Sequence, residues 1–173
     1  MKDIQIEYLS KYIELIPLLA KWHYRQWGDL TGASSEYDYQ KLLFSYTSPQ
    51  SIPMTLLALY DNRPVGSVNI VKSDLGIRPE LTPWLAQLYV VPEKRSRGIG
   101  STLVRVAIGR TTELGFEVLY LYTSGTLPIF YESMGWTTRE VVQYKGKNRT
   151  IMEIKIPVNQ VSDREGERVR SRD

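Results

Sequence analysis

The most informative stretch of the sequence is LYVVPEKRSRGIGS, residues 88–101. It is preceded by apolar residues, so that residues 84–91 form a nearly continuous apolar run, typical of a strand covered on both faces. Pro92 ends this strand. A helical pattern of apolar residues follows over residues 99–114. The stretch is therefore a predicted strand-to-helix junction.

Glycines and basic residues gather at this junction. Gly98 and Gly100 leave no side chain in the way of a ligand at the start of the helix. Successive backbone N–H groups of such a turn, with the unpaired N–H groups of a helix N-terminus, bind anions. Lys94, Arg95 and Arg97 add positive potential. The junction therefore predicts a cradle for a diphosphate.

Two other phosphate-binding loops fit the sequence less well. A Walker loop needs Gly-Lys-Ser/Thr after its first glycine, but Gly100 is followed by Ser101 and Thr102. A dinucleotide fingerprint needs a third glycine where this chain has Leu103. A nucleotide-binding protein that uses the same loop nevertheless remains a hypothesis, which the binding of ATP or NAD would test.

The rest of the chain divides into short elements of both kinds. The periodicity predicts a strand at residues 3–8, helices at 11–26 and from Ser34 or Ser35 to about 46, a hairpin of strands at 54–60 and 65–72, a strand at 117–123, a helix at 127–134, and strands at 136–143 and 150–156. This order predicts one α/β domain over residues 1–157. Residues 158–173 are polar and highly charged and are expected to form a tail.

Composition excludes several kinds of catalyst. The 173 residues are 42% apolar and contain no cysteine and one histidine, which excludes disulfides, thiol nucleophiles and multi-histidine metal sites. The 22 basic and 19 acidic residues give a net charge of +3, with no basic block that would favour nucleic acid. The sequence has neither a membrane-length apolar run nor a signal peptide, so we expect a cytoplasmic protein.

Two blocks of sequence resemble a known superfamily. The run from Leu88 to Gly100 is similar to the acetyl-CoA-binding motif of the GNAT N-acetyltransferases, and residues 130–136 (FYESMGW) resemble the Tyr-x-x-x-Gly-Phe/Tyr segment of that family. The resemblance covers residues 50–156 well, whereas the first 50 residues match only in element order. It implies a mixed, mostly antiparallel sheet of about seven strands and about four helices, splayed between the fourth and fifth strands.

The resemblance also implies roles for individual residues. Backbone groups of the strand would bind the pantetheine arm of acetyl-CoA, and those of the loop would hold its pyrophosphate: Leu88, Tyr89 and Val90, then Arg95, Ser96, Arg97, Gly98, Ile99, Gly100 and Ser101. The Val90 amide would polarise the thioester carbonyl. Tyr131 would protonate the departing thiolate as general acid. An amine would attack the thioester directly, without a covalent enzyme intermediate.

The sequence departs from the family pattern in three places. Ser96 replaces a common glycine, and Ser124 and Leu127 replace a common asparagine and alanine. The strand before Leu88 carries Ala86 and Gln87 where several relatives have an acidic general base.

The general base is therefore unassigned by the motif. Glu80 is the nearest carboxylate, in the loop before this strand, and it could equally be a solvated surface group. His23 could line the acceptor groove, or simply pack in the core of the first helix. An amine that arrives neutral, or a water chain to solvent, would also suffice.

The acceptor is not defined by the sequence. Nine aromatic residues lie among acidic ones in the first 50 residues, which would suit a cationic amine or would simply pack. A polyamine, an aminoglycoside, an amino acid, a peptide N-terminus and a protein lysine all remain open. The leading hypothesis is an acetyl-CoA-dependent N-acetyltransferase. Dimers are common in this family, so a homodimer is a further hypothesis. The alternative is a catalytically weak acyl-CoA-binding regulatory module.

Overall fold

The computed structural model describes residues 4–157, so the predicted tail at 158–173 lies outside the described residues. The elements are, in chain order, β1 (Ile4–Tyr8), two short 3-10 helices (Leu9–Lys11 and Ile13–Leu15), α1 (Ile16–Thr31), α2 (Glu36–Phe44), β2 (Met54–Tyr60), β3 (Arg63–Val71), β4 (Trp84–Val90), a 3-10 turn (Pro92–Lys94), α3 (Ile99–Glu113), β5 (Val118–Thr123), α4 (Leu127–Glu132), β6 (Thr137–Tyr144) and β7 (Lys147–Lys155). None of the described helices is long and apolar enough to cross a bilayer.

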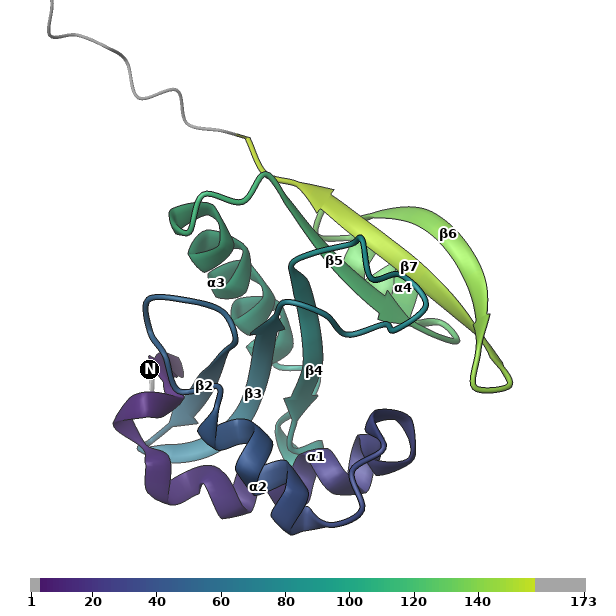
Figure 1. Ribbon diagram of the computed structural model, residues 1–173. Helices are drawn as coiled ribbons and strands as arrows, with labels where there is room; N and C mark the ends of the chain where they lie inside the picture. The colour runs from purple at the N-terminus through teal and green to yellow at the C-terminus, as the bar shows by residue number, and fades with distance from the viewer. Residues whose placement is uncertain (1–3, 158–173) are drawn as a thin grey trace, which may run out of the picture.

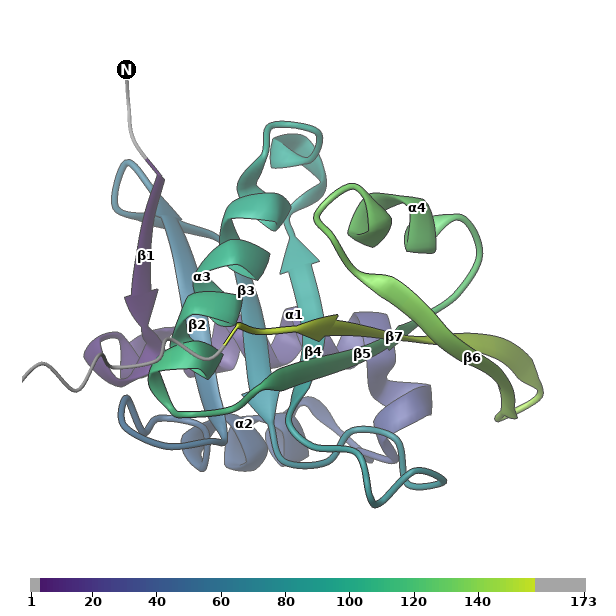
Figure 2. The ribbon, with the colours of Figure 1, turned by 90° about the horizontal axis from the view of Figure 1, so that it is seen from above.

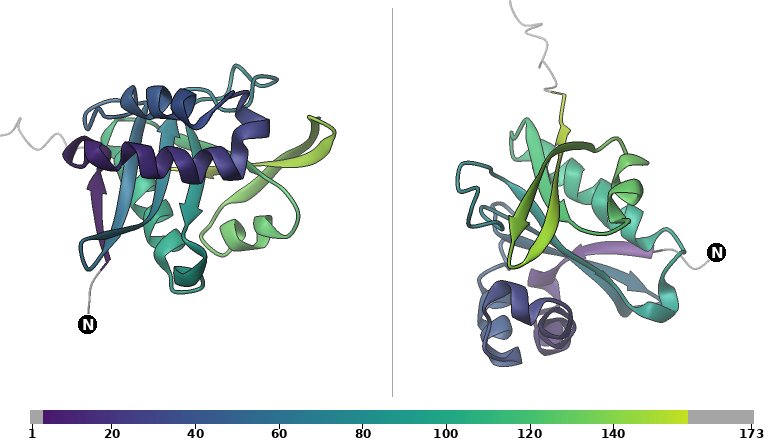
Figure 3. Two further views of the ribbon diagram at one scale, coloured as in Figure 1. Left: turned by 90° about the horizontal axis from the view of Figure 1, so that it is seen from below. Right: turned by 90° about the vertical axis from the view of Figure 1, so that its right-hand side faces the viewer.

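The seven strands form one sheet in the order β1-β2-β3-β4-β5-β7-β6. Every neighbouring pair is antiparallel except β4 and β5, which are parallel. Helices α1 and α2 cover one face of the sheet, and α3 and α4 lie on the other (Figures 1 and 3). This arrangement confirms the fold expected from the sequence.

The sheet opens between its two central strands. Strands β4 and β5 are paired at one position only, Trp84 with Tyr120, near the start of β4. From there they diverge, and Figure 2 shows them running in clearly different directions. The gap between β4 and β5 therefore confirms the predicted splay.

A β-bulge in β4 lies beside this gap. The register between β3 and β4 shifts between Ser67 and Asn69, and Gln87 has a φ of 54°, which few residues other than glycine adopt. Side-chain hydrogen bonds hold the bulge: Asn69 Nδ2 donates to Gln87 Oε1 at 2.6 Å, and Gln87 Nε2 donates to the Tyr39 hydroxyl at 3.1 Å. The strained residue is thus fixed from both β3 and α2.

Two faces of the sheet carry separate apolar layers. Leu85, Leu121 and Met152 pack with α3 and α4, in a cluster that includes Tyr131 and Trp136. Their neighbours Trp84 and Ile151 point to the opposite face, where α1 and α2 lie. This alternation decides which side of the gap each side chain reaches.

The helix boundaries differ from the sequence-based expectation. The first helix begins at Ile16 rather than at residue 11, so Pro17 lies in its first turn, where a missing N–H has no partner to lose. It continues to Thr31 and ends with Gly32 in the left-handed conformation. Ser35 caps α2 by accepting a hydrogen bond from Asp38 N–H, and α2 ends at Phe44 rather than 46.

The turn before β7 also differs from the sequence-based expectation. The turn that joins β6 to β7 is only Lys145 and Gly146, both with positive φ, so β7 begins at Lys147 rather than at 150. After β7 the described chain continues to Pro157. The tighter turn brings the basic residues at the start of β7 into the sheet.

Gly109 lies in the interior of α3 with space around it. An added Cβ would meet no atom within 4 Å, and no positive φ requires glycine there. We expect Gly109→Ala to stabilise the protein by about 0.5–1 kcal/mol, because glycine loses more backbone entropy on helix formation. Urea unfolding would measure this. Gly98→Ala, at φ 79°, should instead destabilise the protein, and a Gly109→Ala variant that unfolds at lower urea would contradict the expectation.

Candidate active site

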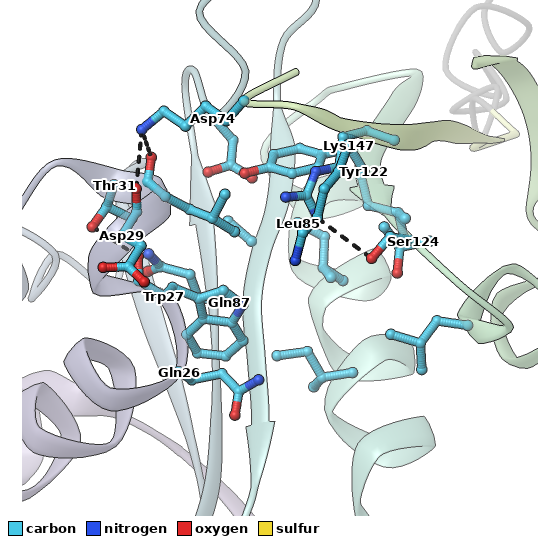
Figure 4. Close-up of a pocket in the computed structure, with 18 of the residues that line it drawn as sticks. Gln26, Trp27, Asp29, Thr31, Asp74, Leu85, Gln87, Tyr122, Ser124 and Lys147 are labelled. Atoms are coloured by element: carbon cyan, nitrogen blue, oxygen red, sulfur yellow. Dashed lines mark hydrogen bonds between the residues drawn. The ribbon is translucent and has the colours of Figure 1, made fainter. Parts of the chain in front are cut away.

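A cavity of about 550 Å³ occupies the gap between β4 and β5 (Figure 4). Leu85, Leu121 and Tyr131 line it and belong to the layer beneath α3 and α4. Tyr122 also lines it, from the layer on the opposite face. Because its walls come from both layers, the cavity passes through the sheet.

The loop after β4 has the geometry of an anion cradle. Ser96 and Gly98 have φ values of 58° and 79°, and α3 begins immediately at Ile99. The first N–H groups of a helix have no partner within it, so those of Ile99, Gly100 and Ser101 are available. Ser96 adopts a positive φ that glycine adopts more easily, and this conformation turns the loop toward the start of α3.

Gly100, beside this cradle, faces the space between β4 and α4. A Cβ on Gly100 would lie 3.6 Å from Phe130 and 3.8 Å from Leu88, and so would point between β4 and α4. The protein itself has room for that atom. Glycine therefore leaves this space free of a side chain.

Backbone groups of β4 also face the gap. Val91 N–H donates to Val65 O of β3 at 2.9 Å. Because backbone groups alternate along a strand, Val90 N–H points away from β3, toward β5. Arg95 Nε donates to Val90 O at 2.9 Å and so folds the loop back on the strand. The Val90 N–H remains the free donor at this point.

The other predicted loop and strand residues contribute differently. Leu88 lines the cavity. The Tyr89 ring packs toward α1, stacked on Trp22 with ring centroids 5.2 Å apart. The Ile99 side chain is buried in the core, and Arg97 is exposed, so these two residues offer the site their backbone.

Tyr131 lies on the wall of the cavity. Its residue is 8% exposed, and its ring makes edge-to-face contacts with Phe130 and Trp136 at centroid distances of 5.0 and 6.0 Å. Burial raises the pKa of its hydroxyl to about 12. The phenol is therefore fully protonated near neutral pH and is available as a donor.

The chain matches a protein-family model over most of the region that contains this site. The model for the acetyltransferase (GNAT) family matches residues 16–136, about two thirds of the chain. The chain is a member of the GNAT family. The match begins within α1, and so includes much of the region that resembled the family only in element order.

Solved GNAT structures share the fold at low sequence identity. An acetyltransferase from Streptococcus pneumoniae has a TM-score of 0.68 at 19% identity, covering 90% of this chain and all of that one. An aminoglycoside 6′-N-acetyltransferase complexed with coenzyme A also has a TM-score of 0.68 at 19% identity, with coverages of 88% and 98%. A spermidine/spermine N-acetyltransferase from Vibrio cholerae has 0.66 at 14%, with 88% and 95%. No curated protein matches the chain in sequence.

Neither predicted base of this GNAT chain reaches the cavity wall. His23 is fully buried, its Nε2 lies 2.9 Å from Ser67 Oγ, and burial lowers its pKa to about 3. Its ring packs edge-to-face on Trp27 and Tyr39. Glu80 is exposed in the loop between β3 and β4. The structure therefore places both groups outside the lining of this cavity.

Asp74, in the same loop as Glu80, is one of two carboxylates that line the cavity, and Asp29 at the end of α1 is the other. Figure 4 shows its carboxyl group pointing toward Tyr122. The residue keeps some exposed surface, but enough protein surrounds the carboxyl group that burial raises its pKa to about 7. The adjacent Leu75 is fully buried and anchors this part of the loop.

Sequence reasoning missed Asp74. It lies three residues after β3, within a polar loop that also contains Glu80. The one available signal was the apolar Leu75 next to it, which indicates that this end of the loop is held against the core. That signal gives burial, but it does not give the direction of the neighbouring carboxyl group.

Charged groups of both signs surround the end of the cavity beneath α1 and α2. Asp29 lines it at the end of α1, and Lys147 and Arg149 line it from β7. Lys145 Nζ donates to the carbonyl oxygens of Asp29 and Leu30 at 3.3 and 2.5 Å. These bonds join the β6–β7 hairpin to the carboxyl end of α1, which favours a cation.

Proposed function

We propose that the protein is an N-acetyltransferase that moves an acetyl group from acetyl-CoA directly to a primary amine. The observation that carries this proposal is the cavity through the β4–β5 gap, because Leu88, Tyr131 and Asp74 all line it. A donor and an acceptor that enter such a cavity would meet within the sheet.

The residues on the donor side fit coenzyme A. Its diphosphate is an anion of the kind that the N–H groups of Ile99, Gly100 and Ser101 bind. The space that Gly100 leaves toward Leu88 suits a narrow arm entering the gap. Acetyl-CoA supplies a thioester as the electrophile. Val90 N–H then donates to the carbonyl oxygen, where negative charge develops during transfer.

Two side chains move the protons. Asp74, with its pKa raised to about 7, is half ionised at neutral pH and accepts the proton from the attacking amine. Tyr131 keeps its proton up to a pH of about 12 and donates it toward the sulfur as the C–S bond breaks. The two groups contribute from opposite faces of the sheet, Asp74 beside Tyr122 and Tyr131 from α4.

Asp74 also weighs against the regulatory module that lacks catalysis. The reason to consider that alternative was the absence of a carboxylate at Ala86 and Gln87. A carboxylate at Asp74 supplies the missing group from a different element. The names of two solved neighbours, an aminoglycoside and a spermidine/spermine N-acetyltransferase, further favour an amine acceptor.

Titration calorimetry with acetyl-CoA, together with a thiol-release screen over amines, tests this function. We expect binding, and thiol release that depends on the amine. We expect Gly100→Val to weaken acetyl-CoA binding by at least about tenfold, because its side chain would fill the space between Leu88 and Phe130 beside the cradle.

Gly109→Ala, in the same helix but with open space around it, is the matched control and should bind normally. Binding without thiol release for every amine would favour the regulatory module. ATP or NAD competing with coenzyme A at similar affinity would favour a nucleotide-binding protein. No binding of acetyl-CoA would overturn the proposal.

A further inference from the structure

Arg149 is a buried cation without a counter-ion. The residue is 7% exposed, and within residues 4–157 its side chain makes one hydrogen bond, from Nη1 to Ser124 Oγ at 3.4 Å (dashed in Figure 4). Its Nε is buried without a partner, and over residues 4–157 no carboxylate forms an ion pair with it. Arginine is almost never buried to this degree unless it is paired, so the residue is built to receive a ligand.

The position of Arg149 assigns it to the acceptor side of the cavity. Alternate residues of a strand share a face, so Arg149 lies on the same face as Ile151. Ile151 packs in the cluster with Trp84, on the face opposite to the layer that contains Tyr131. The diphosphate cradle at the start of α3 lies on the other side of the sheet. Arg149 is thus separated from it by the sheet, and it lines the cavity itself.

The charges beside Arg149 limit the kind of acceptor. Asp74 is placed to receive the proton of an amine, and Asp29 adds a second carboxylate at the end of α1. Three cations, Lys145, Lys147 and Arg149, line the same cavity, so basic groups outnumber acidic ones in its lining. A polyamine or an aminoglycoside would bring a second ammonium group toward these cations, and like charges repel strongly in a partly buried site. An acceptor with one amine and one anionic group would satisfy both signs.

We propose that the acceptor is a small aminocarboxylic acid, such as a free amino acid, and that Arg149 binds its carboxylate. A guanidinium is a planar donor whose N–H groups match the two oxygens of a carboxylate. The Nε of Arg149 is covered by protein, so its terminal nitrogens are the atoms that would meet a carboxylate in the cavity. The inference rests on the proposed acetyl transfer, and it names the acceptor class of that same site.

Matched pairs of amines test the inference. A panel of L-amino acids is compared with the corresponding carboxamides, which keep the amine and lose the negative charge. We expect kcat/KM for the acids to exceed that for the amides by at least about tenfold in the wild-type protein. The comparison is conservative, because an amide lowers the pKa of the neighbouring amine and so provides more of the reactive neutral form.

Variants then assign the preference to Arg149. We expect Arg149→Gln to bring the acid-to-amide ratio close to one, Arg149→Lys to keep part of the preference, and the control Lys155→Gln, an exposed cation farther along β7, to leave the ratio unchanged. A wild-type protein that acetylates the amides as well as the acids would overturn the inference and leave the acetyltransferase intact.

A binding measurement separates this inference from the proposed function. We expect amino acids, but not their amides, to raise the melting temperature of the protein saturated with coenzyme A, and Arg149→Gln to abolish that rise. If this pattern appears without any acetyl transfer, the carboxylate site stands and the proposed function fails. Equal shifts with acids and amides would count against the site, and so would an unchanged pattern in Arg149→Gln.

Discussion

Replacing Asp74 by Asn is expected to lower kcat/KM by about a hundredfold to ten-thousandfold at pH 8, the range typical of losing a general base. Asn keeps the size of the side chain but cannot accept the proton of the amine. In the wild-type protein, kcat/KM should rise with pH through about 7, as Asp74 ionises. The variant should lose this rise. Initial rates of thiol release across pH 5.5 to about 9 would measure both effects.

The same substitution should stabilise the protein above neutral pH. Because burial raises the pKa of Asp74 from 3.8 to about 7, the folded state holds its proton more tightly than the unfolded state. The stability that this proton gives is fully present below about pH 4 and is lost as pH rises to about 7. Relative to wild type, Asp74→Asn should therefore gain about 1–3 kcal/mol between pH 4 and pH 8.

Glu80→Gln is the matched control for Asp74. It removes an exposed carboxylate from the same loop, and it should leave the rate of thiol release unchanged. If Glu80→Gln abolished turnover while Asp74→Asn did not, the base would be the residue first considered from the sequence. An Asp74→Asn variant that is both fully active and no more stable at pH 8 would remove Asp74 from the mechanism.

Tyr131→Phe is expected to lower kcat by about tenfold to a hundredfold and to leave the Kd for acetyl-CoA nearly unchanged. The ring contacts with Phe130 and Trp136 remain, and among residues 4–157 no hydrogen bond to the hydroxyl would be lost. The variant should therefore fold normally. Steady-state kinetics with a good acceptor, beside calorimetry with acetyl-CoA, would separate the two effects.

The pH profile distinguishes Tyr131 from Asp74. Because the Tyr131 pKa is about 12, the hydroxyl contributes no change of protonation between pH 6 and 9, and Tyr131→Phe should lower the whole profile without shifting it. Tyr120→Phe is the control and should keep full activity, because Tyr120 lies in β5 and packs on Trp84. Unchanged turnover in Tyr131→Phe would show that another group protonates the thiolate.

Local sequence signals were sufficient for much of the fold. The apolar run at residues 84–91 and the glycines at the start of α3 are local features, and the structure places the strand and the helix within one residue of the predicted bounds. The first helix was predicted less well: it was expected from residue 11, but it begins at Ile16, so that Pro17 lies in its first turn. The backbone of the donor side follows from the same local signals.

The acceptor side depended on contacts between distant segments. Asp74 and Glu80 look alike in sequence, and only the packing of Leu75 against the sheet decides which carboxyl group is held at the cavity. Arg149 looks like one more charge in a basic turn, until the two-residue turn at Lys145 and Gly146 places it inside the sheet. No spacing rule contains this information, because both positions depend on tertiary contacts.

The cavity's passage through the sheet has a consequence for how substrates bind and products leave. If the donor approaches from beneath α3 and α4 and the acceptor from beneath α1 and α2, neither has to leave before the other arrives. Each product can also leave through the opening by which the corresponding substrate entered. Both substrates would then be bound at the same time. The order in which they bind would depend on their affinities, because they do not share an entrance.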